Sequence, residues 1–142
     1  MSDKAISLMG LMRKANAIQF GEDNTGAAVK GGKAKLLLVA ADASDNARKR
    51  AEGFAYGRNV LLVHLPYAKQ ELSAGVGLSG CSMAAVTDLG FANALMKELA
   101  ASQPERYVGL SEEIAGRHEK ARRRKAEKHK SSKNKSKGLK ED

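Results

Sequence analysis

The stretch GKAKLLLVAADAS (residues 32–44) decides the fold class. Its centre, residues 34–40, is apolar apart from Lys35, which is typical of a β-strand covered on both faces. Two further apolar runs follow it, RNVLLVHLPY (residues 58–67) and GCSMAAVTDLGF (residues 80–91). Segments with helical periodicity separate the runs, and strands that alternate with helices indicate a three-layer α/β/α sandwich. We therefore predict an α/β fold around a mainly parallel, mixed central sheet of about four strands.

Start and stop signals give the expected bounds of the elements. Acidic residues in the first turn and the pair Gly31-Gly32 at the end, for example, delimit a helix over residues 22–30. An earlier helix is indicated by Ile6, Met9 and Met12, which recur at helical spacing after Ser2-Asp3. The other helices are expected at 44–54, 67–76 and 90–100, and the strands at 17–20, 34–40, 60–65 and 82–87.

The basic residues are concentrated toward the C-terminal end. The 142 residues carry 25 Lys and Arg against 16 Asp and Glu, a formal net charge of +9. Residues 104–142 hold 13 of the basic and 7 of the acidic residues, and after residue 115 they contain almost no large apolar side chain except Leu139. Such a segment buries too little apolar area to offset its ordering entropy. We predict one compact domain over residues 1–103 and a basic tail, partly helical or disordered, over residues 104–142.

Length, charge and cysteine content limit the class of protein. A pI near 9.8 favours polyanions as partners, with acidic membrane surfaces as the competing class. No apolar run approaches the ~20 residues that span a bilayer, and the N-terminus shows no signal-peptide cleavage pattern. The single cysteine, Cys81, excludes an internal disulfide and a multi-thiolate metal site. We expect a cytoplasmic protein with no metal or cofactor, no membrane partner and no small-molecule substrate.

Two segments resemble nucleotide-binding motifs, but the residues and elements around them do not fit those motifs. GVGLSG (residues 75–80) spells a dinucleotide fingerprint, which needs a strand before it and a helix after it, whereas here the order is reversed. The cluster at residues 31–33 lacks the Ser or Thr of a phosphate loop, because Ala34 stands there. Cys81, before a buried strand, and His64, at the end of an apolar strand, are expected to pack as core residues. Since no set of reacting groups is present, we predict that the protein is not an enzyme.

Two segments carry a family resemblance. They are GEDNTGAAVKGGKAKL (residues 21–36) and ELSAGVGLSGCSMAAVTDLGFA (residues 71–92). Together they resemble the kink-turn RNA-binding ribosomal protein family of the L-seven-Ae/L-thirty-e type, specifically its short bacterial members. The resemblance covers roughly residues 4–101. It implies an RNA-binding domain with the same three-layer fold, no cofactor, and a binding surface made by the start of the second helix and the loop before the fourth strand.

The resemblance implies RNA-binding residues at the start of the second helix. The family has a glycine there, followed by an Asn-Glu pair and by a Lys three residues after the Glu. Gly21 matches the glycine, and after Glu22 the residues Asp23 and Asn24 fall on the pair, so that amide and carboxylate exchange places. Both groups can take the donors and acceptors of a guanine edge, which irregular RNA exposes and a regular A-form helix hides.

The family lysine has no counterpart here, since Ala27 falls on its position. This departure removes a cation that would favour phosphate. Lys30, one turn later, or Lys33 can supply the missing charge.

The second implied element is the loop from Leu78 to Ser82, which matches the family loop that packs against a splayed nucleotide. Gly80, Cys81 and Ser82 are small enough to allow a base to approach the backbone closely. Another interpretation stays open for both elements. Residues 22–25 are ordinary helix-start residues, and the glycines of residues 75–80 are typical of turns and caps.

The tail adds a further predicted RNA contact. Ser111-Glu112-Glu113 is typical of a helix start, and residues 117–140 contain 12 basic residues opposed only by Glu119 and Glu127. No aromatic residue interrupts the basic cluster, which favours phosphate attraction over base stacking, although a solvated tail that aids solubility remains open. The cluster is Arg122, Arg123, Arg124 and Lys125.

The sequence thus predicts a ribosomal or ribosome-associated protein that recognises a bent, kink-turn-like structured RNA in ribosomal RNA. Two alternatives remain: a protein-interaction adaptor on the same fold, and an RNA-substrate domain detached from a methyltransferase-like system.

Overall fold

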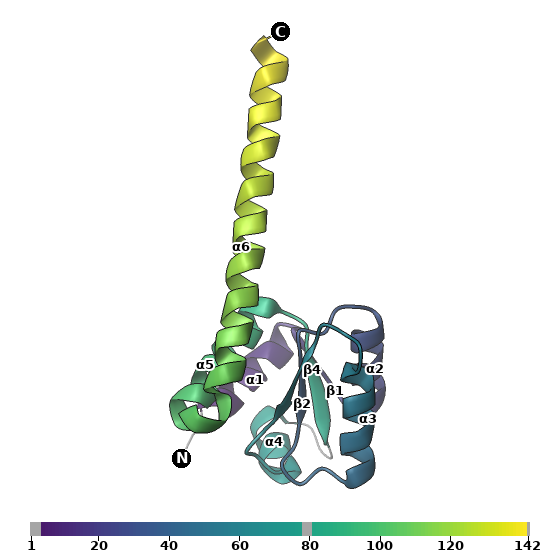
Figure 1. The fold of residues 1–142 in the computed structure, drawn as a ribbon. Helices are drawn as coiled ribbons and strands as arrows, with labels where there is room; N and C mark the ends of the chain where they lie inside the picture. Colours follow the sequence, from purple (N-terminus) through teal and green to yellow (C-terminus); the bar gives the residue numbers. More distant parts are fainter. Residues whose placement is uncertain (1–3, 78–80, 142) are drawn as a thin grey trace.

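The computed structural model describes the backbone of residues 4–77 and 81–141 and, in the last helix, side chains as far as Glu127. Helices and strands alternate through most of the chain, as predicted (Figure 1). The helices are α1 (Lys4–Lys14), α2 (Glu22–Lys30), α3 (Asp45–Ala55), α4 (Lys69–Val76), α5 (Leu89–Ser102) and α6 (Pro104–Glu141). The strands are β1 (Ile18–Phe20), β2 (Leu36–Val39), β3 (Leu61–His64) and β4 (Met83–Val86).

The four strands form one mixed sheet in the order β1-β4-β2-β3. The α/β class and the mixed four-stranded sheet are confirmed, but parallel pairs do not dominate. Only β2 and β3 are parallel, whereas β4 runs antiparallel to both β1 and β2. His64, which ends β3, and Met83, which begins β4, both pair with Val39. The chain therefore enters β4 at the end of the sheet where β3 stops, and the connection through α4 reverses its direction.

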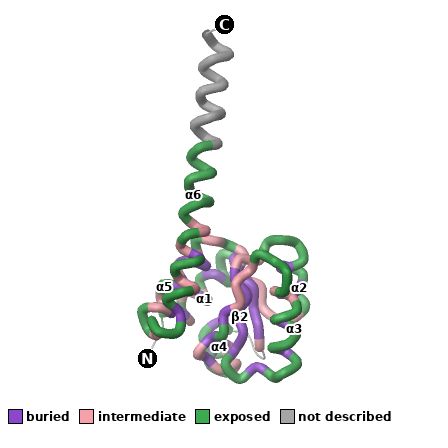
Figure 2. The backbone as a smooth tube through the Cα atoms, viewed as in Figure 1, coloured by how far each residue is buried: buried purple, intermediate pink, exposed green. Residues whose placement is uncertain are grey.

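Strand β2 explains why the sheet is covered on both faces. Leu36 and Leu38 pack in the larger core with residues of α1, α4, α5 and α6. Leu37 and Val39 pack in a second core with residues of α2 and α3. This alternation is the period of two expected of a strand, and it produces the three layers of the sandwich. Figure 2 shows the buried strands between helices whose outer sides are exposed.

The last helix begins at Pro104, seven residues before the predicted start at Ser111, and Pro is favourable at a first helical position. Tyr107 and Ile114 are 1% and 0% exposed and belong to the larger core. The Tyr107 hydroxyl donates a 2.5 Å hydrogen bond to the backbone oxygen of His64. Burial raises the pKa of this phenol more than neighbouring Arg106 lowers it, so it stays a donor. The first turns of α6 are thus part of the compact body, which continues past residue 103.

The side chain of His64 is exposed, although the sequence suggested a core histidine. It lies at the last residue of β3, an edge strand, where the larger core no longer covers it. Over the described ranges, no helix combines the length and the apolar character needed to cross a membrane.

Candidate nucleic-acid interface

Helix α2 begins at a backbone conformation that favours glycine. Gly21 has φ 96° and ψ 157°, a region that other residues rarely adopt, although nothing within 4 Å would obstruct a Cβ atom. Its N–H donates to the backbone oxygen of Met83 at 3.1 Å. This bond attaches the first turn of α2 to the start of β4.

The same bond brings the two predicted RNA-binding elements together. Cys81 and Ser82 directly precede Met83 and are half-buried, and the Ser82 backbone oxygen accepts from Ala40 N–H at 2.9 Å. Leu78 and Gly80, also predicted for this site, lie outside the described residues. The start of α2 and the segment before β4 are therefore neighbours at one end of the sheet.

Burial raises the pKa of the Cys81 thiol, and nearby Arg13 lowers it by less. The thiol is therefore protonated at neutral pH and is a poor nucleophile.

The polar side chains in the first turn of α2 differ in their surroundings. Glu22 forms an ion pair with Arg50 of α3 at 3.5 Å, so its carboxylate is partly engaged within the protein. Asp23 is exposed. Asn24 is also exposed, and its amide nitrogen donates to the backbone oxygen of Phe20 at 3.0 Å. This bond orients the Asn24 side chain before any ligand binds.

A groove of about 390 Å³ runs along one side of α2. Three residues of α2 and the C-cap residue that follows it line the groove at the spacing i, i+3, i+4 and i+7, which places them on one face of the helix. The lining consists of Asn24, Ala27, Ala28 and Gly31, with Lys33 beyond the helix and Asn16, Gln19 and Thr87 from neighbouring segments.

Of the two lysines proposed to replace the missing family cation, one lines this groove and the other does not. Lys33 lines it together with Ala27, whereas Lys30 is exposed in the last turn of α2. The groove also contains polar residues that the sequence did not indicate. Gln19 donates from its amide to Asn16 at 3.3 Å, and Asn16 has a left-handed φ of 57°. The alternation of Gln19 with the apolar residues Ile18 and Phe20 in β1 was the sequence signal that could have indicated its partly exposed side chain.

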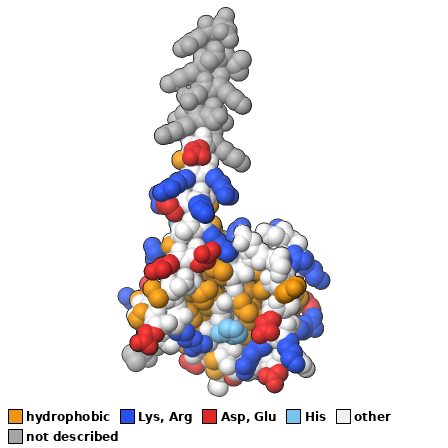
Figure 3. Space-filling model, viewed as in Figure 1, with side chains coloured by type: hydrophobic (Ala, Val, Ile, Leu, Met, Phe, Trp, Pro, Cys, Tyr) orange, Lys and Arg blue, Asp and Glu red, His pale blue; other side chains and the backbone are white. Residues whose placement is uncertain are grey.

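The basic cluster of the tail lies apart from this groove. Arg122, Arg123, Arg124 and Lys125 are on the part of α6 that extends away from the body, where basic side chains predominate (Figure 3). Arg122 and Arg123 form exposed ion pairs with Glu119 at 3.7 and 3.4 Å. Exposed pairs of this kind contribute little to stability, so these cations remain available to another anion.

Residues 3–96 match the sequence model of the Ribosomal protein L7Ae/L30e/S12e/Gadd45 family. The chain belongs to this family. The assignment confirms the resemblance inferred from the sequence and agrees with a binding protein rather than an enzyme. The match ends within α5, so the whole of the basic helix α6 lies beyond the matched residues.

Individual members and structures are also similar to this chain. The RNA-binding protein YlxQ of Bacillus subtilis (strain 168) is 34% identical over 96 residues, which are 65% of this chain and 91% of that protein. A Bacillus halodurans protein of unknown function matches 68% of this chain and 97% of its own, with a TM-score of 0.63 and 24% identity. The 15.5kD RNA binding protein of Giardia lamblia matches 77% and 85%, with a TM-score of 0.55 and 20% identity. These two structures support the family fold.

Proposed function

We propose that this protein binds structured RNA and recognises a bent, kink-turn-like element of ribosomal RNA, on or with the ribosome. Membership of the Ribosomal protein L7Ae/L30e/S12e/Gadd45 family and the likeness to a protein named as RNA-binding support the general function. The observation that carries the specific proposal is the bond from Gly21 N–H to the Met83 oxygen. It joins the two segments that the family resemblance implies for RNA binding.

Recognition in this proposal uses the exposed edge of α2. Asp23 and Asn24 take the donors and acceptors of exposed guanine edges, and Ser82 allows a splayed base to come close to the backbone. Lys33, at the far end of the groove, supplies the cation that Ala27 does not. Leu78, Gly80 and the side chain of Cys81 complete the proposed loop, and the α6 cluster of residues 122–125 contacts phosphates without reading sequence.

Asn24→Ala should lower the preference for a kink-turn RNA over a plain duplex by about tenfold, because one good base contact contributes ~1–3 kcal/mol of discrimination. Binding to the plain duplex should hardly change. The measurement is a competition titration of the two RNAs. Asn46→Ala is the matched control, since Asn46 is an exposed asparagine in the first turn of α3. Equal preference ratios for the two variants and the unaltered protein would contradict this site.

Ala27→Lys should tighten kink-turn binding by about three- to tenfold, because it adds one phosphate-contacting cation to the groove that Asn24 and Lys33 line. The control is Ala101→Lys, which adds the same charge at an exposed position of α5. General electrostatic attraction would improve both variants equally for both RNAs. The proposal requires that only Ala27→Lys raises the ratio of kink-turn to duplex affinity.

A further inference from the structure

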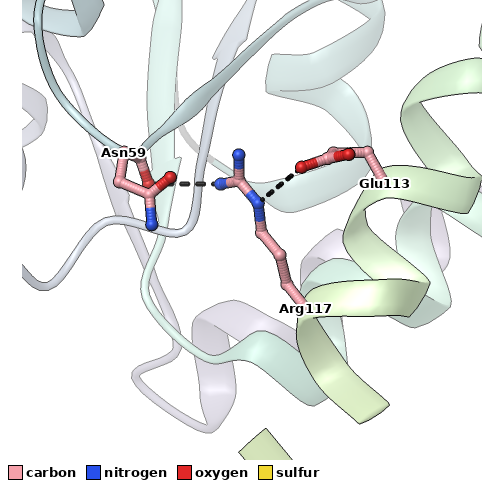
Figure 4. Close-up of polar contacts among 3 residues, drawn as sticks. All are labelled: Asn59, Glu113 and Arg117. Carbon is pink, nitrogen blue, oxygen red and sulfur yellow. Dashed lines mark hydrogen bonds and ion pairs between the residues drawn. The ribbon is translucent and has the colours of Figure 1, made fainter. Parts of the chain in front are cut away.

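Arg117 attaches α6 to the turn between α3 and β3. Its Nη1 donates to the backbone oxygen of Asn59 at 3.3 Å, and its Nε donates to Glu113 at 3.1 Å (Figure 4). Only 26% of the Arg117 side chain is exposed. Residues 119–127 of α6 are all exposed, and this helix extends away from the body (Figure 1). Together with the buried Tyr107 and Ile114, the contact with Asn59 holds the direction in which the basic part of α6 projects.

A second hollow, of about 300 Å³, lies at the same turn. It is lined by Lys35 and Arg58 together with Asn59, whose backbone oxygen holds Arg117. Arg58 is exposed and donates one long hydrogen bond, 3.5 Å, to the Val29 backbone oxygen near the end of α2. The hollow thus offers two cations beside the point where α6 departs.

The basic residues of α6 divide into two faces. At 3.6 residues per turn, Lys120 and Arg124 stand three and seven positions after Arg117 and share its face. Arg117 contacts Asn59, and Asn59 also lines the hollow. The inner face of α6 is therefore turned toward the hollow. Arg122 and Arg123, which pair with Glu119, are turned about 140° and about 120° away from Arg117 and form an outer face. Two acidic residues flank this inner face, Glu113, which is paired with Arg117, and Glu127, three positions after Arg124.

We propose that the hollow (Lys35 and Arg58) and the inner face of α6 (Lys120 and Arg124) form one phosphate-binding surface for a double-stranded RNA stem. The inference rests on the proposed RNA-binding function and adds a second contact, at the end of α2 opposite the Asn24 site. The two cation pairs are held at a fixed angle by the packed first turns of α6 and by the contact of Arg117 with Asn59. They carry no aromatic side chain, so they suit the phosphates of a duplex, which is recognised by shape and backbone, more than a single strand, which needs stacking platforms.

The test compares three double variants of the full chain on a blunt RNA duplex of about 20 base pairs. Lys35→Ala/Arg58→Ala removes the hollow pair, Lys120→Ala/Arg124→Ala removes the inner pair, and Arg122→Ala/Arg123→Ala is the matched control on the outer face. The hollow and inner pairs should each weaken duplex binding about tenfold and reduce the slope of log Kd against log salt by about 1–2. The outer pair, with the same change in charge, should lose at most about threefold.

Equal losses from the inner and outer pairs would overturn the inference, because α6 would then act as an undirected polycation. An unchanged affinity for the hollow variant would overturn it as well. Stronger binding of one separated strand than of the duplex, lost on changing the 87% exposed Tyr56 to Ala, would indicate a stacking platform instead. In each of these cases the preference for a kink-turn still tests the proposed function separately. A protein that binds neither RNA contradicts both.

Arg117 is a positioning residue in this proposal. A variant that removes its contact with Asn59 tests whether Arg117 acts by orienting α6 or only by its own positive charge. In an Arg117→Gln background, the difference between the losses from the inner and outer pairs should become smaller, because α6 loses its contact with Asn59 while Tyr107 and Ile114 still pack in the core. A merely electrostatic role for Arg117 would weaken binding and leave the difference between the two faces unchanged, and that result would contradict its role as a positioning residue.

Discussion

A chain that ends at Gln103 should lose most of its cooperative unfolding transition, whereas a chain that ends at Glu119 should unfold like the full-length protein. The reason is the burial of Tyr107 and Ile114, which are almost completely inaccessible in the larger core. Burying two such side chains contributes about 3–6 kcal/mol, and their loss also exposes the face of α5 that they cover. That is a large part of the ~5–15 kcal/mol by which a typical domain is stable. Thermal and urea unfolding followed by circular dichroism measure the difference.

A point substitution checks the same claim without shortening the chain. Ile114→Ala should lower the free energy of unfolding by about 2–5 kcal/mol, because it leaves a cavity in the core. Val108→Ala, at a 47% exposed position of the same helix, is the control and should cost less than about 1 kcal/mol. If the chain ending at Gln103 melts at the temperature of the full-length protein, the first turns of α6 do not belong to the domain.

The chain that ends at Glu119 should bind RNA about 100-fold more weakly than the full-length protein at 100 mM salt. Residues 120–142 contain 11 of the 25 basic residues and 3 of the 16 acidic ones, so their removal lowers the formal charge from +9 to +1. If four to six of these cations contact phosphates, the slope of log Kd against log salt becomes shallower by about 4–5, because fewer counterions are released. Titrations at several salt concentrations measure both quantities.

The kink-turn preference should survive this truncation, because the Asn24 site and its groove are retained. An unchanged salt slope would show that α6 beyond Glu119 does not contact RNA. A lost preference with an unchanged slope would instead place the specific contacts on α6.

The layers of the fold follow from local patterns. A run such as residues 34–40 buries both faces of a strand, and the Gly pair after Lys30 ends a helix, so the elements lie close to where the sequence predicts them. The direction of β4 does not follow from such patterns. Whether the chain enters it at the end beside Val39 or at the other end depends on how α4 packs, and the apolar pattern of a strand does not indicate its direction in the sheet.

The extent of the core was harder to predict for a related reason. The charge of residues 104–142 dominates their composition, and two buried side chains, Tyr107 and Ile114, are a weak signal within it. Their spacing of seven residues places them on one helical face, which is the pattern that marks the contact with α5.

Only those residues of the candidate site that match the family motif could be predicted from the sequence. The glycine at position 21 and the small residues before β4 were recognisable, and the structure places their segments together through one backbone bond. The groove partners Gln19 and Thr87 come from other segments, and the tether formed by Arg117 depends on a turn 58 residues earlier in the chain. Such long-range neighbours have no local signature.

Crosslinking in cells, followed by sequencing of the attached RNA, tests the central claim most directly. If the protein recognises a bent ribosomal RNA element, reads from the unaltered chain concentrate at one or a few such elements, and Asn24→Ala lowers these peaks relative to the background. Recovery of no RNA above the uncrosslinked control, or reads spread over abundant transcripts and unaffected by Asn24→Ala, would contradict it.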